Sequence, residues 1–155
     1  MALALLTGCS DSRSKAKQVE ECFRSLMKTR QNVDYQKDET LDKKLEAIAQ
    51  QFQPDWLDNR TGGLTEHART IIINELRGYL LTGSVWLWYG EVKPGQSALA
   101  QAESMKYSQG IEIALLDSGI PTLQAIAFTM TGKKSDGHRY YLALRTNATI
   151  KTPQG

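Results

Sequence analysis

The spacing of the apolar residues changes near residue 84, and this change limits the chain to folds in which helices precede strands. Before that point, apolar residues recur every three or four positions, which is the spacing of one face of an α-helix. After it, they alternate with polar residues, which is the spacing of a β-strand. Helices and strands that are segregated along a chain indicate an α+β fold, and 155 residues suit a single domain.

Three apolar stripes predict three helices before residue 84. The first follows residue 17, the second spans about 40–52 and ends before Pro54, and the third begins near Thr65 as N-cap and ends at Gly83. The residues predicted to be buried on these stripes are Val19, Cys22, Phe23, Leu26 and Met27, then Leu41, Leu45, Ile48, Ala49 and Phe52, then Ala68, Ile71, Ile72, Leu76, Tyr79 and Leu80.

Four strands are predicted in the second half, joined as an antiparallel meander. The predicted strands are 84–92, 111–115, 122–131 and 138–146, with 96–106 as a short helix or an irregular crossing. The stretch TGKKSDG joins the last two strands as a hairpin, because glycine stands at both of its turns. Three helices followed by four antiparallel strands are similar in element order to the cystatin-like and NTF2-like folds.

The predicted strand SVWLWYGEV carries the largest side chains of the sheet. Trp86 and Trp88 are expected on one face, and Val85, Leu87 and Tyr89 on the other, because successive strand residues point to opposite sides. Both faces are apolar, so this strand is covered on both sides or lines a cleft. Trp86, Trp88 and Tyr89 are therefore the candidate binding residues, with core packing as the alternative role.

The first ten residues, MALALLTGCS, stand apart from the predicted domain. The residues up to Leu6 are apolar or small, and polar residues run without a break from Ser10 to Lys15. A core segment rarely stops so abruptly, whereas an export signal has an apolar core, small residues and then a polar mature start. The stretch Leu6-Thr7-Gly8-Cys9 resembles the lipobox of bacterial lipoproteins.

In that family the cysteine thiol receives a diacylglyceryl group, the signal is cut just before it, and the new amino terminus is acylated. The resemblance implies that Cys9 is lipidated and is the first mature residue. Ser10 in the next position resembles proteins that are sent to the outer membrane, which implies an outer-membrane lipoprotein facing the periplasm. Because no Lys or Arg precedes the apolar stretch, we expect the true start to lie upstream of Met1.

These observations divide the chain into four parts. We expect residues 1–8 to be the remnant of a signal peptide, 9–16 the lipidated cysteine with a polar tether, 17–147 a single α+β domain, and 148–155 a flexible tail. No run of 18 apolar residues is present, so no membrane-spanning helix is predicted. The lipid on Cys9 is the expected contact with the membrane.

The sequence contains none of the common catalytic motifs, such as HExxH, a Walker loop, GxSxG or GxGxxG. The net charge of +2 does not indicate a nucleic-acid partner, and the two cysteines lack the spacing of a zinc site. We therefore expect no cofactor and no metal. The sequence favours a non-enzymatic lipoprotein that binds a protein or an apolar ligand in the envelope.

Two alternative functions stay open. The first is a small NTF2-like enzyme or apolar-ligand binder with a pocket between sheet and helices, for which His67 and His138 are the available histidines. The second is a structural subunit of a secretion or conjugation assembly, in which aromatic residues of the Trp86–Tyr89 stretch form an exposed interface. The burial and surroundings of Trp86 and Trp88 bear most directly on this choice.

Overall fold

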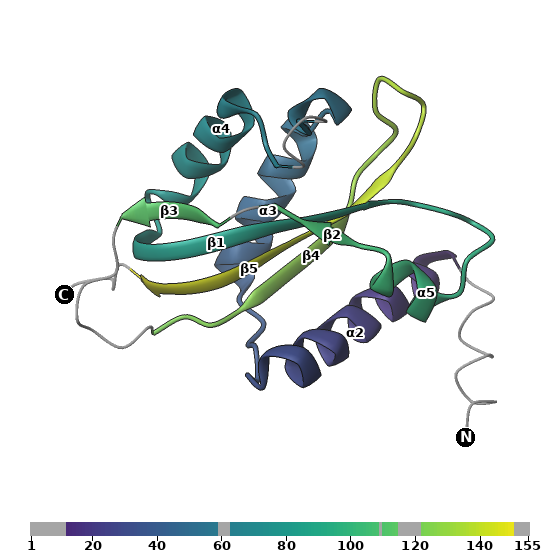
Figure 1. Cartoon of the computed structure of the whole chain (residues 1–155), viewed down its shortest axis with the longest axis horizontal. Helices are drawn as coiled ribbons and strands as arrows, with labels where there is room; N and C mark the ends of the chain where they lie inside the picture. The colour runs from purple at the N-terminus through teal and green to yellow at the C-terminus, as the bar shows by residue number, and fades with distance from the viewer. Residues whose placement is uncertain (1–11, 59–62, 109, 115–121, 151–155) are drawn as a thin grey trace.

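The protein is an α+β domain in which helices cover both faces of one antiparallel sheet (Figure 1). The structure, a computed structural model, describes residues 12–58, 63–108, 110–114 and 122–150. The α+β class and the order of helices before strands are as the sequence predicts. The first ten residues, including Cys9, lie outside the described residues.

The first three described helices correspond to the three predicted apolar stripes, although their ends differ. The helices are α2 (Ser12–Gln31), α3 (Glu39–Gln51), α4 (Glu66–Leu76) and the short α5 (Ala98–Glu103), with a 3-10 turn at Pro54–Trp56. The strands are β1 (Leu80–Glu91), β2 (Lys106–Tyr107), β3 (Ile111–Ala114), β4 (Ile126–Met130) and β5 (Tyr140–Ile150).

Side-chain caps begin three of these helices. Asp38 accepts a hydrogen bond from the amide of Leu41 (2.8 Å) at the start of α3. The predicted N-cap of α4 is confirmed, because the Thr65 hydroxyl accepts from the amide of Ala68 (3.2 Å). Ser97 caps α5 in the same way. Burial, together with the hydrogen bond that its hydroxyl donates to Asp38 (2.7 Å), raises the pKa of Tyr79 to about 12.

The strand order is β2-β1-β5-β4, with β3 also pairing with β1, so the prediction of a simple meander is wrong. The first and last strands are central neighbours, and they pair from Leu80 opposite Ile150 to Glu91 opposite Tyr140. The two strands that follow β1 in sequence are too short to match it, since β2 has two residues and β3 has four. One edge of β1 is therefore shared between β2 and β3, and its other edge pairs with β5.

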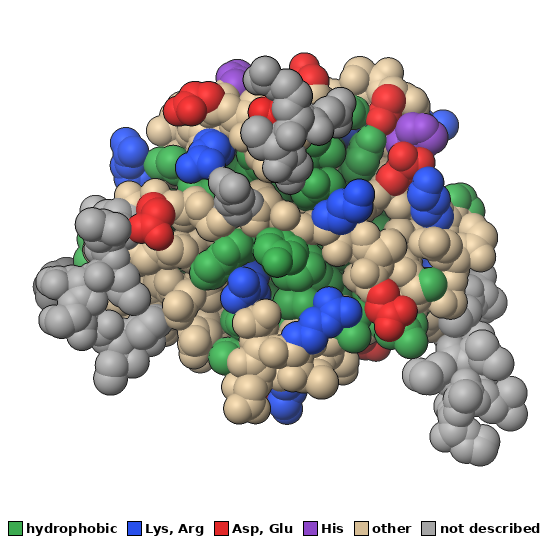
Figure 2. Space-filling model, in the orientation of Figure 1, with side chains coloured by type: hydrophobic (Ala, Val, Ile, Leu, Met, Phe, Trp, Pro, Cys, Tyr) green, Lys and Arg blue, Asp and Glu red, His purple; other side chains and the backbone are tan. Residues whose placement is uncertain are grey.

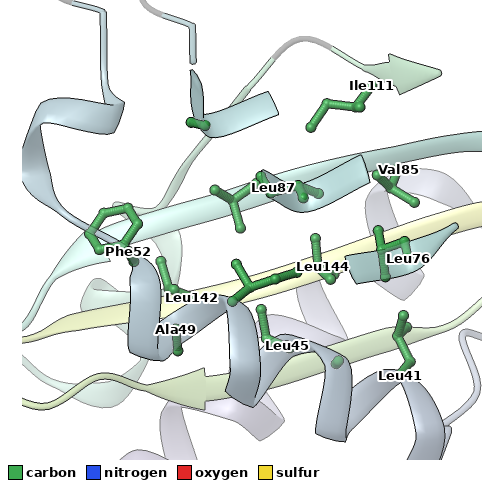
Figure 3. Close-up of a cluster of buried hydrophobic side chains, with 14 of the residues drawn as sticks. Leu41, Leu45, Ala49, Phe52, Leu76, Val85, Leu87, Ile111, Leu142 and Leu144 are labelled. Atoms are coloured by element: carbon green, nitrogen blue, oxygen red, sulfur yellow. The ribbon is translucent and has the colours of Figure 1, made fainter. Parts of the chain in front are cut away.

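Two apolar clusters hold the helices to opposite faces of the sheet. The larger cluster joins α3 and α4 to the sheet, and its central side chains are fully buried (Figure 3). It includes Leu41, Leu45 and Ile48 of α3 and its C-cap residue Phe52, Ile72 and Leu76 of α4, and Val85, Leu87, Leu142 and Leu144 of the sheet. The smaller cluster joins α2 and α5 to the other face, through Val19, Phe23, Met27, Trp88, Ala102, Met105, Ile126, Tyr141 and Ala143.

The boundary between α4 and β1 differs from the prediction. Helix α4 ends at Leu76 rather than Gly83, and β1 begins at Leu80 rather than at residue 84. Leu80 is buried, as predicted, but it belongs to a strand and not to a helix. Gly83 lies inside β1 with φ +122°, opposite Ala148 of β5, where the two backbones come very close. Glycine is required there by the sheet and does not act as a helix stop.

Two predicted boundaries of the domain also need correction. Helix α2 begins at Ser12, so the predicted tether of residues 9–16 is helical from residue 12 onward. Strand β5 continues to Ile150, so the predicted flexible tail of residues 148–155 begins with strand. Ala148 is fully buried and exchanges backbone hydrogen bonds with Leu123 (2.8 and 3.1 Å). The ordered domain therefore exceeds the predicted range 17–147 at both ends.

We expect Gly83→Ala to destabilise the fold by about 3 kcal/mol. Alanine is strained at the positive φ of this position, and its Cβ would overlap with atoms of β5. A Cβ at this position would lie 2.5 Å from both Ala148 Cα and Asn147 O. The free energy of unfolding from urea denaturation measures the effect. Gly78→Ala is the matched control, since a Cβ at that position would meet nothing within 4 Å. Equal stability of the two variants would contradict the close approach of β1 to β5.

Candidate functional site

The three aromatic residues predicted as binding candidates occupy different environments. Trp88 is 5 % exposed and belongs to the core beneath α2, where Phe23 contacts it edge-on with 5.2 Å between ring centroids. Trp86 lies on the same face and is partly buried. Tyr89 lies on the opposite face and packs against the larger cluster. The strand is covered on both faces, so core packing is the main role of Trp88.

Trp88 and Tyr89 also line a groove at the β2 edge of the sheet, which we call the β2 groove. Its volume is about 570 Å³. Tyr107 of β2 is 58 % exposed there, and its ring centroid lies 4.6 Å from that of Trp88 at an interplanar angle of 35°. The groove is lined by Arg30, Leu57, Asp58, Trp88, Tyr89, Met105, Lys106 and Tyr107.

The short strand β2 is what places Tyr107 against Trp88. It pairs Tyr107 with Trp88 and Lys106 with Tyr89, so each side chain joins the corresponding face of the sheet. Ser108 fixes the end of this pairing, because its amide donates to Leu87 O (2.9 Å) and its hydroxyl accepts from the amide of Leu87 (3.2 Å). The exposed aromatic ring is therefore held by a backbone ladder rather than by a loose loop.

The β2 groove combines aromatic surface with a positive charge. Arg30 and Lys106 form no ion pair with other described residues, and Asp58 is the single carboxylate among the lining residues. Burial raises the pKa of Tyr89, so its hydroxyl stays protonated at neutral pH and can donate a hydrogen bond. Figure 2, in the orientation of Figure 1, shows hydrophobic side chains gathered near the middle of the visible surface, with Lys and Arg side chains beside them.

Trp86 belongs to a second arrangement, which we call the Trp86 cluster and which consists of Tyr35, Trp86 and Arg145. The Arg145 guanidinium lies 4.0 Å from the centroid of the Trp86 ring, within the range of a cation–π interaction. Its Nη1 donates to the hydroxyl of Tyr35 (3.1 Å). Sequence reasoning missed Tyr35, Tyr107 and Arg145; the one signal available for Arg145 was a charged residue directly after the apolar run Tyr140–Leu144 of its strand.

The groups that would serve catalysis are dispersed. His67 and His138 are both exposed, and His138 Nδ1 lies 3.2 Å from a Glu91 carboxylate oxygen. Within the described ranges, no group of three or more His, Cys, Asp or Glu side chains is arranged to hold a metal ion. The same ranges contain no helix that is both long and apolar enough to cross a bilayer.

We expect alanine variants to separate the buried ring from the exposed one. Trp88→Ala should lower the free energy of unfolding by about 3–5 kcal/mol, because it leaves a cavity beneath α2. Tyr107→Ala should cost about 1 kcal/mol or less, since most of that side chain is already in solvent. Chemical denaturation of both variants tests this. A loss for Tyr107→Ala as large as that for Trp88→Ala would show that Tyr107 is a core residue.

Known proteins give no further guide to the site. No protein-family model matches the chain, and no curated protein or solved structure is significantly similar to it. The chemistry of the β2 groove and of the Trp86 cluster must therefore be judged from their own residues.

Proposed function

We propose that this protein is a non-enzymatic lipoprotein of the bacterial envelope, anchored in the membrane through Cys9, which binds a protein partner in the β2 groove. The observation that carries the proposal is the exposed ring of Tyr107 packed at a tilt against the buried ring of Trp88. An exposed aromatic side chain that rests on a rigid core loses little conformational entropy on binding. Such residues commonly dominate the energy of protein interfaces.

The charges around the groove support recognition of a partner. Arg30 and Lys106 flank the aromatic floor, and arginine and aromatic residues are both enriched at interfaces. Tyr107 offers exposed apolar contact area, while the hydroxyl of Tyr89 can form a directed hydrogen bond. A partner segment that carries an apolar side chain beside an acidic group would match this combination.

The proposed anchor would hold the start of α2 close to the membrane. Only Ser10 and Asp11 separate Cys9 from the first residue of α2, so even an extended connection spans at most about 11 Å. Several acyl chains on one cysteine anchor a protein stably, whereas one chain does not. Ser10 directly after the cysteine favours the periplasmic face of the outer membrane, so the expected partner is an envelope protein that reaches the periplasm.

Two observations favour this function over the pocket enzyme or ligand binder. The space between the sheet and helices α3 and α4 is filled by fully buried side chains such as Leu45, Ile72 and Leu144 (Figure 3). The two histidines are both exposed at the surface. The third candidate is a structural subunit of a secretion or conjugation assembly. Such a subunit would have the same lipid anchor, but several partner proteins would contact its domain instead of one.

We expect a palmitate analogue to label the protein in a bacterial host, because lipidation at Cys9 attaches fatty acyl chains. The label should be lost in Cys9→Ser and kept in Cys22→Ser, which is the matched control for the second cysteine. The protein is expressed from its own gene with the flanking sequence intact. Label that persists in Cys9→Ser, or that never appears in the wild type, would contradict the anchor.

We expect a photo-crosslinking amino acid at position 107 to capture a defined envelope protein in living cells. Leu81 provides the control position, because it is 53 % exposed on β1 away from β2. Lys106→Glu should weaken the adduct at position 107, since it reverses a charge at the groove. Adducts of equal intensity at positions 107 and 81 would show that the β2 groove is not the binding surface. Capture of several different subunits would favour an assembly component.

A further inference from the structure

The sheet face beneath α2 and α5 is only partly covered by the described helices (Figure 1). The covered part carries Trp88, Tyr141, Ala143 and Ile126, all at most 5 % exposed. Farther along the same strands, the paired residues on this face are Trp86 with Arg145, Ser84 with Asn147, and Thr82 with Thr149, and each of them is partly exposed. We call this second part the open half-face.

The open half-face is polar, and its side chains are bonded across the strands. Thr82 and Thr149 share a hydroxyl hydrogen bond (2.7 Å), and Gln124 Nε2 donates to Asn147 Oδ1 (3.4 Å). The Ser84 hydroxyl donates to Glu112 (3.0 Å) at the β3 edge. Hydroxyl and amide groups in rows of this kind offer both donors and acceptors to an extended peptide.

Arg145 places a positive charge on the open half-face. No carboxylate of the described residues lies within ion-pair distance of it. One face of its guanidinium is covered by Trp86, Nη1 is bonded to Tyr35, and Nε is buried without a hydrogen-bond partner among the described atoms. A partly desolvated cation gains more from an added carboxylate than an exposed one does.

We propose that the open half-face binds an acidic segment of a partner protein, with one carboxylate of that segment on the Arg145 guanidinium. The open half-face has room for one negative group of the partner, on Arg145. Glu112 lies on the same half-face and would repel a second anion. A single carboxylate therefore fits better than a polyanion such as nucleic acid. This site goes beyond the proposed function, since it uses none of the residues that line the β2 groove.

Two-dimensional ¹H–¹⁵N NMR of the full chain tests the site through its tryptophan indoles. The probe is a Gly/Ser peptide with one central glutamate, and its glutamine counterpart is the control ligand. We expect the glutamate peptide to shift the Trp86 indole signal, with an affinity in the millimolar range, while the buried Trp56 signal stays in place. The indole signal that disappears in Trp86→Phe is the signal of Trp86.

Substitutions then identify the cation that binds the carboxylate. Arg145→Gln should weaken binding of the glutamate peptide by about tenfold or more, and Arg145→Lys by less, because lysine keeps the charge and loses the planar fork. Arg139→Gln is the matched control, since Arg139 is an exposed arginine next to the same strand. An unchanged Trp56 indole signal verifies that each variant is folded. If Arg145→Gln does not fold, the weaker binding expected of Arg145→Lys and the difference between the glutamate and glutamine peptides still test the proposal.

Three results would overturn the proposal. The first is an equal shift of the Trp86 signal with the glutamine peptide, and the second is full binding by Arg145→Gln. The third is an equal response to inorganic phosphate or to a short oligonucleotide, because the site would then lack preference for a carboxylate. If Arg30→Gln abolished binding while Arg145→Gln did not, the acidic segment would bind in the β2 groove. That outcome would refute this site and leave the proposed function standing.

Discussion

The pairing of β1 with β5 is the interaction on which the rest of the structure depends. These two long strands run side by side from Leu80 and Ile150 to Glu91 and Tyr140, and the short strands attach at their outer edges. Alternation along the pair then assigns every side chain to one of two faces. Val85 and Leu87 join the core under α3 and α4, whereas Trp86 and Trp88 face the other way. The whole arrangement requires Gly83, because only glycine permits the close approach to β5.

The two faces differ in solvent exposure because their helices cover them to different extents. On one face, α3 and α4 bury a continuous set of aliphatic side chains and leave them little contact with solvent (Figure 3). On the other, α2 and α5 cover Trp88 and its neighbours and leave Trp86 and Arg145 partly exposed. The small side chain of Ala143 opposite Trp88 also leaves room for the large ring and for the edge of Phe23. The partly exposed Trp86 and Arg145 therefore share one face of the sheet, whereas Tyr89 and the exposed Lys106 lie on the other.

Local signals predicted the helices better than the sheet. The range 40–52 is close to the observed α3, because its cap at Asp38 and its stop before Pro54 are both encoded within a few residues. Leu80 fits a helical stripe and a strand equally well, so periodicity could not locate the end of α4. Gly83 resembles a helix stop until its contact with Ala148 is known, and that contact joins segments far apart in the chain. The extension of β5 to Ile150 likewise depends on its pairing with β1.

The candidate site was predictable only as a region. The stretch from Trp86 to Tyr89 was identified from its composition, but its partners Tyr35, Tyr107 and Arg145 come from three other segments. The structure also gives Trp88 two roles that a sequence cannot separate, since the same ring closes the core and supports Tyr107 in the β2 groove. A surface built on a core residue keeps its shape before a partner arrives, which lowers the entropic cost of binding. Because truncation of Trp88 removes both roles, a loss of binding in that variant would not by itself locate an interface; only changes at the exposed side chains can do so.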